Sequence, residues 1–340
     1  MNLFLFPEAA NSNNGYGFAV ERDFLRLQPS KEDLIVWYTI LDKEDMGYLR
    51  TNDIIIKKNK TLSFKSIYNI LLGNDRTELL TNELTFLRKF SFDKIFCGDT
   101  IFYKAIRSLF PNAHIFVRFH NCFSRIYDRK ELLGLSFDWK FNLKLTNMYK
   151  LERKIFNDKN TDKIFISNED RNYYTSMYGR VFDSKTWMMG VNLELVKKNR
   201  KQIKYNNIIA WLGGVESHKK ASLVWFIRNV FPLIKNEIPN VEFHLWGRET
   251  EKFNNHSNGI FGHGFFKGTG MPVKNAIYIN PDLIGGGVKI KLLTLIEAGI
   301  PFISSPFGFE GYSKDLIDNK YCYVEENDKW AERIIEILKF

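Results

Sequence analysis

The sequence predicts an α/β protein of two domains, each a parallel sheet with helices on both faces. A chain of 340 residues is long enough for two cores, because single cores seldom grow past about 250 residues. Its 44% apolar content is typical of globular proteins. Short β-rich runs alternate with segments of helical periodicity along both halves, and strands separated by helices form parallel sheets.

The first half carries this alternation from its first residues. Apolar, β-rich runs predict strands at 3–6, 34–40, 53–57, 94–97, 113–119, 163–167 and 185–189. Helical spacing of apolar residues predicts helices at 18–27, 79–90, 100–110, 138–157 and 169–178. Between the first strand and the first helix, residues 11–17, which end in Gly15-Tyr16-Gly17, predict a loop.

A polar stretch rich in Lys and Asn, residues 197–207, predicts the link between domains at 1–196 and 205–329. The alternation restarts with a helix at 221–234 and strands at 208–212, 241–246, 259–266, 276–279 and 300–304. Ligands of open α/β sheets bind at the carboxyl ends of strands, so we expect the reaction in the cleft between the halves. Glycines fall at such strand ends at positions 213, 214, 247, 262 and 264.

A phosphate cradle is predicted where Gly285, Gly286 and Gly287 precede a helix at 292–299. Glycines let the backbone approach a ligand, and the positive end of a helix dipole favours an anion. Lys289 and Lys291 add charge at the same end, and Leu292, Leu293, Leu295 and Ile296 face the core. The alternative interpretation is a tight turn without a ligand.

The order and spacing of residues 280–311 resemble the donor-site signature of glycosyltransferase family 4 and its relatives (glycosyl transferases group 1). The shared features are the glycine-rich loop, the Lys-Ile-Lys helix start and the Gly-Ile-Pro-Phe-Ile-Ser-Ser strand. The resemblance implies the GT-B architecture, with two Rossmann-like domains facing each other. It also implies transfer of a sugar from a nucleoside-diphosphate sugar to a glycan or polyprenyl-linked glycan, with retention at the anomeric carbon. The usual setting is bacterial surface polysaccharide synthesis, such as lipopolysaccharide or O-antigen.

The resemblance also suggests site residues, over 205–315 and more loosely over 95–192. His120, at a strand end, would face the donor sugar, and Lys291 would stabilise the leaving diphosphate. The expected donor-binding residues are Gly213, Gly214, Lys219, Arg248, His263, Gly264, Phe265, Gly285, Gly286, Gly287, Val288, Lys289, Thr294 and Glu297. Gly15, Tyr16 and Gly17 would form the acceptor-side loop. The helical segment 330–340 would cross back to pack on the first domain, as in relatives.

One departure from the family is clear. Many members carry two glutamates eight positions apart, where this chain has Gly286 and Thr294. Glu297 substitutes only if the register differs. An inactive nucleotide-sugar-binding protein therefore remains an alternative, as does a sugar-nucleotide epimerase of the same architecture.

The charge of +10 suggests a polyanionic partner, either nucleic acid or an anionic membrane face, with simple solubility as the alternative. No nucleic-acid recognition motif or Lys/Arg-rich tail is present, so nucleic acid is the weaker interpretation. The helix at 138–157 combines aromatic and basic residues and would suit an anionic membrane surface. The alternative there is an ordinary surface helix with one buried side.

Neither a metal nor a cofactor is expected. The chain has no Asp-x-Asp motif, the histidines lack metal-ligand spacing, and the nucleotide sugar is a co-substrate. No apolar run reaches the roughly 18 to 20 residues that span a bilayer. Three scattered cysteines, an odd number, fit a reducing compartment. We therefore expect a cytoplasmic protein, with peripheral binding at the inner face of the plasma membrane as a further possibility.

Overall fold

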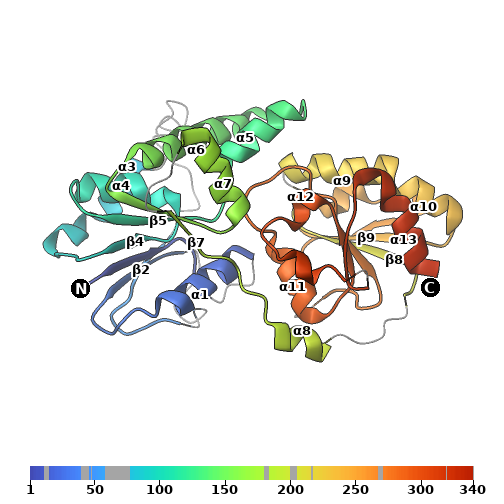
Figure 1. The fold of residues 1–340 in the computed structure, drawn as a ribbon, viewed down its shortest axis with the longest axis horizontal. Helices are drawn as coiled ribbons and strands as arrows, with labels where there is room; N and C mark the ends of the chain where they lie inside the picture. The colour runs from blue at the N-terminus through green and yellow to red at the C-terminus, as the bar shows by residue number, and fades with distance from the viewer. Residues whose placement is uncertain are drawn as a thin grey trace. The chain divides into compact units, whose positions relative to one another are not determined.

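A computed structural model describes residues 1–10, 15–39, 46, 48–57, 77–179, 184–199, 205–215, 217–266, 271–318 and 320–339. The chain divides into two compact units (Figure 1). The first consists of Met1–Glu131 and Asp138–Met189, and the second of Leu132–Phe137 and Gly190–Phe340. The division after Met189 comes earlier than the predicted end of the first domain at residue 196.

The first unit is built on a sheet of seven parallel strands in the order β3-β2-β1-β4-β5-β6-β7. In that order they are Ile54–Lys57, Leu34–Thr39, Leu3–Phe6, Ile95–Cys97, Ile115–Phe119, Thr161–Phe165 and Ser184–Thr186. Each lies within about two residues of a predicted strand, since apolar runs bounded by polar residues mark buried parallel strands well.

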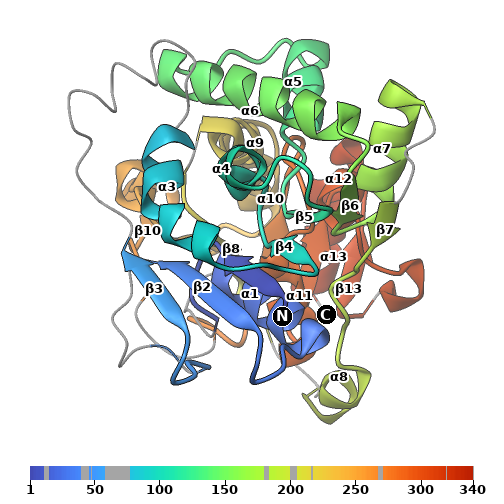
Figure 2. The same cartoon turned by 90° about the vertical axis from the view of Figure 1, so that its left-hand side faces the viewer.

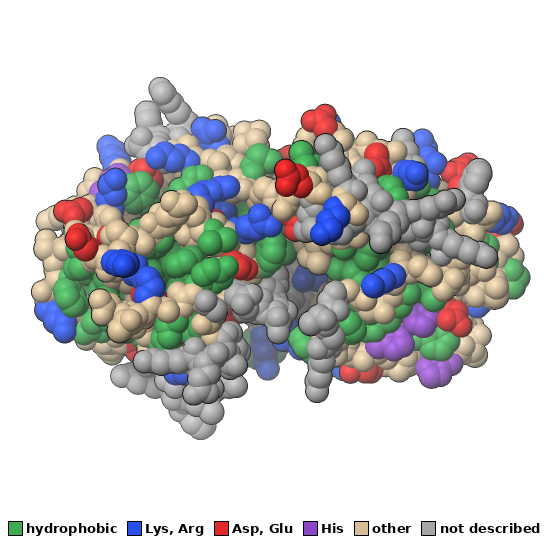
Figure 3. All heavy atoms as spheres, turned by 90° about the horizontal axis from the view of Figure 1, so that it is seen from below, with side chains coloured by type: hydrophobic (Ala, Val, Ile, Leu, Met, Phe, Trp, Pro, Cys, Tyr) green, Lys and Arg blue, Asp and Glu red, His purple; other side chains and the backbone are tan. Residues whose placement is uncertain are grey.

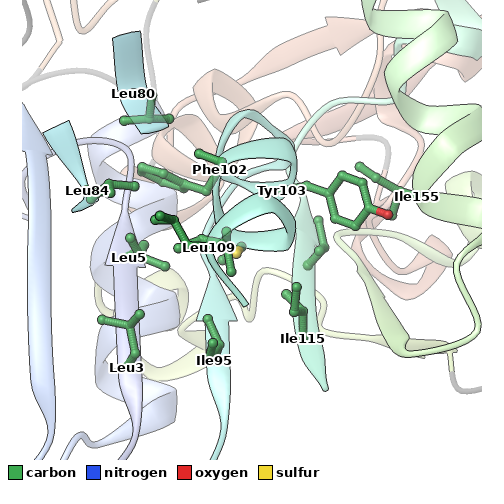
Figure 4. Close-up of a cluster of buried hydrophobic side chains, with 14 of the residues drawn as sticks. Leu3, Leu5, Leu80, Leu84, Ile95, Phe102, Tyr103, Leu109, Ile115 and Ile155 are labelled. Carbon is green, nitrogen blue, oxygen red and sulfur yellow. The ribbon is translucent and has the colours of Figure 1, made fainter. Parts of the chain in front are cut away.

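Both faces of this sheet are covered by helices, because alternate residues of each strand point to opposite faces (Figure 2). Leu3 and Leu5 lie in a core that also holds residues of α3 (Thr77–Glu83), α4 (Tyr103–Leu109), α6 (Trp139–Asn157) and α7 (Asn168–Tyr178). Figure 4 shows side chains of this core. Phe4 and Phe6 lie in a second cluster that includes Val20 of α1 (Gly15–Leu27). Two short 3-10 helices, η2 (Thr85–Lys89) and η3 (Thr100–Phe102), complete the predicted helical segments 79–90 and 100–110.

A buried carboxylate joins three helices of the first unit. Glu152 of α6 is fully buried and accepts hydrogen bonds from the backbone N–H groups of Phe123 (2.9 Å) and Ser124 (2.8 Å) at the start of α5 (Phe123–Leu132). It also accepts from the hydroxyls of Ser124 (2.5 Å) and of Tyr174 on α7 (2.6 Å). The first N–H groups of a helix have no hydrogen-bond acceptor within the helix, and Glu152 supplies one for α5.

The second unit is built on six parallel strands in the order β10-β9-β8-β11-β12-β13. In that order they are Ile260–Gly262, Glu242–Trp246, Ile208–Leu212, Ile277–Asn280, Phe302–Ser304 and Cys322–Val324. The core on one face includes side chains of α9 (Ser217–Asn229), α10 (Phe231–Glu237) and α13 (Trp330–Lys339). The remaining short elements of this unit are η4 (Thr250–Phe253), η5 (His256–Asn258), η6 (Lys314–Leu316) and η7 (Asn327–Lys329).

The structure differs from the expected elements at several places. The single helix expected at 221–234 is two helices, because Pro232 lies in the first turn of α10, which begins at Phe231, and proline cannot continue a preceding helix. Part of the expected link is helix α8 (Leu193–Asn199), which contacts α11 (Ile290–Ala298). Gly15, Tyr16 and Gly17 begin helix α1, so the prediction of a loop there is wrong; the preceding residues 11–14 lie outside the described residues.

The C-terminal helix also differs from expectation. It was expected to pack on the first domain, but α13 contacts α10 of the second unit. Trp330 is fully buried and Ile334 lies with it in the second core. The indole Nε1–H of Trp330 donates to the carbonyl of Glu325 at 3.0 Å, which fixes the helix start. The apolar side of α13 is therefore buried in the core of the second unit.

Replacing Glu152 by Ala is expected to destabilise the first unit by about 2 to 4 kcal/mol, because two backbone N–H groups and two hydroxyls would lose a buried acceptor. Urea unfolding of the full chain measures the loss. Glu131→Ala, which removes an exposed carboxylate from α5, is the control and should change stability by no more than about 0.5 kcal/mol. A loss below about 1 kcal/mol for Glu152→Ala would show that water replaces the carboxylate.

Candidate functional site

Parallel pairing gathers the loops that follow β8, β9, β10, β11 and β12 at one edge of the second sheet. The strand order reverses direction between β8 and its neighbour β11, since β9 and β10 extend one way and β12 and β13 the other. Open α/β sheets bind ligands at such a reversal, beyond the carboxyl ends of the strands. The candidate site therefore consists of these loops.

Close backbone packing joins the loops after β8, β9 and β10. The Gly213 N–H donates to the carbonyl of Trp246 at 2.9 Å, and the Gly247 N–H donates to the carbonyl of Gly264 at 2.7 Å. Gly247 has φ 141°, and a Cβ added there would lie 1.9 Å from the carbonyl oxygen of Gly213. Only glycine fits this position, so three of the predicted glycines are held together as one surface.

The loop after β11 leads into helix α11, as the glycine pattern predicts. Gly287 has φ 69°, a left-handed conformation that favours glycine. The Tyr312 hydroxyl accepts from the N–H of Leu293 (3.1 Å) and donates to the carbonyl of Lys289 (2.9 Å), which caps the helix start. The predicted apolar stripe of this helix is confirmed, since its members are buried: Leu292, Leu293, Leu295 and Ile296.

Lys291, in the first turn of α11, carries a buried ammonium group. Its Nζ lies 3.4 Å from a carboxylate oxygen of Asp282 and 5.6 Å from the ring centre of Trp211 on β8. Although 19% of the side chain is exposed, the nitrogen itself is buried and makes no hydrogen bond within the described part of the chain. Burial lowers the pKa of Lys291 to about 8, with Asp282 acting in the opposite direction. A buried cation at a helix N-terminus is suited to hold an anion.

Two other predicted cations lie on the same group of loops. The ammonium of Lys289 donates to the carbonyl of Gly287 at 3.0 Å and lies 4.7 Å from the ring centre of Phe307. Lys219 is in the first turn of α9, which follows the Gly213-Gly214 loop, and its charge acts on Lys291. Arg248 follows Gly247, and its carbonyl accepts from the N–H of Val215 at 3.0 Å.

A polar network supports the loop after β11. The Ser305 hydroxyl donates to the carbonyl of Asp282 (2.5 Å) and accepts from the N–H of Gly308 in helix α12 (Pro306–Phe309) at 2.9 Å. The Asn280 amide donates to the Ser304 hydroxyl at 3.0 Å. Sequence reasoning placed these residues in the family signature but gave them no role; the Ser-Ser-Pro start of α12 is the signal that identifies the cap.

A band of stacked rings covers the β9–β10 part of the sheet. His263 stacks on Trp246 with ring centres 4.6 Å apart, and its Nε2 lies 2.9 Å from Nδ1 of His244. Figure 3 shows histidine side chains gathered beside hydrophobic ones on this unit. Burial lowers the pKa of His263, which favours a neutral imidazole. Phe265, two residues on, is 68% exposed. Both predicted residues thus lie at the carboxyl end of β10.

Two of the predicted donor-binding residues lie along α11, beyond the glycine loop. Glu297 accepts a hydrogen bond from the backbone N–H of Asn192 at 2.9 Å. It precedes the last residue of α11, about 12 Å along the helix axis from the start at Lys289. Thr294 is exposed, with its hydroxyl 3.4 Å from the carbonyl of Ile290. The structure therefore brings Lys291 to the glycine loop but leaves Glu297 at the opposite end of the helix.

In the first unit, His120 directly follows β5 and is buried. Its Nε2 lies 3.5 Å from Asp23 of α1, whose carboxylate is paired with the buried guanidinium of Arg118 at 2.7 Å. Arg118 also donates to the carbonyls of Phe165 and Trp187. Burial lowers the pKa of His120, with Asp23 acting in the opposite direction. The imidazole is therefore neutral at pH 7 and is suited to hydrogen bonding with a hydroxyl.

Among the described residues, no group of three or more His, Cys, Asp or Glu side chains could hold a metal ion. In the same part of the chain, every helix is too short or too polar to cross a bilayer. The three cysteines are buried and unpaired with each other, as expected for small apolar residues.

Residues 206–339 match the family model described as Glycosyl transferases group 1. The match covers most of the second unit, which is therefore similar to this family. The predictions of a glycosyltransferase and of the GT-B architecture are thereby confirmed, the latter by the fold of both units. A comparison with curated protein sequences finds no match.

Solved structures share the fold over the whole chain. WaaG, a glycosyltransferase involved in lipopolysaccharide biosynthesis, has 10% identity and a TM-score of 0.63, covering 100% of this chain and 91% of that one. Sucrose-phosphate synthase from Thermosynechococcus elongatus has 10% identity and a TM-score of 0.64, with coverage of 100% and 90%. The lipopolysaccharide outer core galactosyltransferase WaaB has 12% identity and a TM-score of 0.55, with coverage of 100% and 90%.

Gly247→Ala is expected to destabilise the second unit by about 2 to 4 kcal/mol, because it adds a backbone clash to an unfavourable φ. Urea unfolding of the full chain measures the loss. Gly134→Ala is the matched control, since Gly134 has φ 60° with open space around its Cβ position, and it should cost about 1 kcal/mol. Equal losses in the two variants would mean that the loops separate without cost.

Proposed function

We propose that the protein transfers a sugar from a nucleoside-diphosphate sugar to a glycan or polyprenyl-linked glycan, in the synthesis of a bacterial surface polysaccharide. The observation that carries the proposal is the buried Lys291 ammonium beside the glycine loop at the start of α11. The family of the second unit supports the reaction class, and the lipopolysaccharide enzymes WaaG and WaaB support the setting.

The proposed chemistry needs no metal ion. When the bond between the sugar and the diphosphate breaks, negative charge grows on the departing diphosphate. Lys291, Lys289 and the N–H groups at the start of α11 are fixed before the reaction, so they stabilise this charge without reorganising. The neutral imidazole of His120 would hydrogen-bond the donor sugar, and retention at the anomeric carbon is proposed from the family resemblance.

An inactive nucleotide-sugar-binding protein is the second candidate. Gly286 and Thr294 stand where many family members have glutamates, and Glu297 is bonded to the backbone of Asn192 instead of lying at the glycine loop. This candidate would bind the donor without turnover. An epimerase of the same architecture would change the sugar without an acceptor. Product analysis with one donor, in the presence and absence of acceptor, separates the three outcomes.

The first test of the proposal is the thermal stability of the chain with UDP, ADP, GDP, CDP or dTDP. Binding at 100 times Kd adds about 2.7 kcal/mol, enough to shift the melting midpoint by several degrees. We expect a shift with one base that is much smaller in Lys291→Ala at the same nucleotide concentration, because the ammonium contacts the diphosphate. Lys329→Ala, which removes an exposed lysine outside the site, should keep the shift. No shift with any nucleotide would contradict the proposal.

We also propose that α6 docks on an anionic membrane surface, where a lipid-linked acceptor would be found. Its exposed residues include Trp139, which is 64% exposed and lies 5.6 Å from the Lys140 ammonium. Four further basic residues of α6 are exposed: Lys144, Lys150, Arg153 and Lys154. Two other apolar residues of α6 are not free to contact a membrane, because Ile155 is buried and Tyr149 packs on Tyr127.

Sedimentation with phosphatidylglycerol vesicles tests this surface. We expect binding at low salt that weakens at high salt, because each basic residue near the surface contributes about 1 kcal/mol. Lys144→Ala with Lys150→Ala should reduce the partition coefficient by about tenfold or more. Lys252→Ala with Lys329→Ala removes the same charge from exposed positions in the second unit and should have little effect. Equal losses in both double variants would attribute binding to net charge alone.

A further inference from the structure

A buried carboxylate in a predicted anion site calls for a physical explanation. Asp282 follows β11 and is only 2% exposed. It lies in the loop that leads to the three glycines, where we propose that a diphosphate binds. A negative charge at this position repels a diphosphate, and burial strengthens that repulsion. A residue that weakens diphosphate binding in this way must contribute to the site by another interaction.

The position of Asp282 is fixed from two sides. Its backbone carbonyl accepts from the Ser305 hydroxyl, which also caps α12, so a shift of the loop would break its bond to this cap residue. Its carboxylate faces Lys291, with 3.4 Å between Oδ2 and Nζ. The same ammonium lies 5.6 Å from the ring centre of Trp211. Lys291 therefore has an aromatic ring and a carboxylate as its neighbours, and a cation is attracted by both.

Other charges around Lys291 act against it. Lys219, from the first turn of α9, and Lys289, from the loop before α11, both disfavour a third positive charge. Burial disfavours it further, and together these effects lower the pKa of Lys291 to about 8. Asp282 is the group that opposes them. Without it, the buried amine would lose its proton more readily.

We propose that Asp282 is a positioning residue for the donor diphosphate: it keeps the Lys291 ammonium charged and held beside Trp211 while the site is empty. This inference rests on the proposed function, because it requires the diphosphate to bind at Lys291. The repulsion between Asp282 and the diphosphate is the cost of having a charged lysine ready in a buried position.

Asp282→Asn then has two effects of opposite sign. It removes the repulsion on the diphosphate, which tightens binding at every pH. It also lowers the pKa of Lys291 below about 8, because it removes the carboxylate that favours the charged form, so less of the ammonium form is present at neutral and alkaline pH. At about pH 6 the lysine stays mostly charged and the first effect dominates. At about pH 8 the second effect dominates.

The experiment measures Kd by calorimetry for the nucleoside diphosphate that stabilises the wild-type chain, chosen from UDP, ADP, GDP, CDP and dTDP. Each titration is repeated from about pH 6 to about pH 9. The ratio of the Kd of Asp282→Asn to that of wild type cancels the titration of the nucleotide itself. We expect a ratio near or below one at about pH 6 that rises to about tenfold or more at about pH 8. A loss of affinity through local misfolding would be present at every pH.

Asp328→Asn is the matched control. Asp328 is an exposed carboxylate on η7, outside the site loops, and its replacement changes the net charge by the same amount. Its Kd ratio should stay near one at every pH. A ratio for Asp282→Asn that is equally flat overturns the inference, provided that the wild-type chain binds. If the wild-type chain binds no nucleoside diphosphate, the proposed function itself fails.

A second comparison separates an effect of Asp282 that acts through the Lys291 ammonium from an effect on the loop itself. In a Lys291→Met background neither variant contains the ammonium, so Asp282→Asn should no longer weaken binding at about pH 8 and should tighten it by removing the repulsion. If Asp282→Asn weakens binding equally with Met or Lys at position 291, the carboxylate acts on the loop alone and the inference is overturned.

Discussion

All strand pairings in both sheets are parallel, and the candidate site depends on this constraint. Parallel strands deliver every following loop to the same edge, so loops that are distant in sequence become neighbours. In the second unit this edge collects backbone from the glycine-containing loops after β8, β9, β10 and β11, and the contact of Gly247 with the Gly213 carbonyl leaves no room for a side chain. The loops after β8, β9 and β10 therefore meet through their peptide groups.

The charged groups at this edge show why the site is energetically unusual. A lysine in the first turn of a helix already meets the positive end of the helix dipole, and burial adds a desolvation cost. Lys291 bears both of these unfavourable effects, and its attraction to Trp211 and Asp282 offsets them in part. An anionic ligand relieves both costs at once. The free protein therefore stores unfavourable electrostatic energy at the position where we propose that the ligand binds.

The sequence was most informative where a local pattern determines the structure. Strands such as β1 and β8 were predicted at their observed bounds, because a short apolar run flanked by polar residues has few alternatives. Helix α5 was not predicted, because its sequence is mostly polar and its start is held by Glu152 from another helix. Strand β13 was also not predicted.

The same distinction applies to the candidate site. The loop at residues 285–287 and Lys291 were predicted, since glycines before a helix start are a local signal. The relation of Asp282 to Lys291 was not, because it depends on how a strand end and a helix start meet in space. Glu297 was expected at the ligand, yet its helix position places it at the other end, where it holds the backbone of Asn192.

Glu152 has a consequence for motion within the first unit. One carboxylate accepts hydrogen bonds from α5 and α7 while belonging to α6, so none of these helices can detach without leaving polar groups of another without a partner. Partial opening is thus penalised, and the three helices would exchange their amide hydrogens as one cooperative unit. His120 lies three residues before the start of α5, so its loop would be either fully formed or lost together with all three helices.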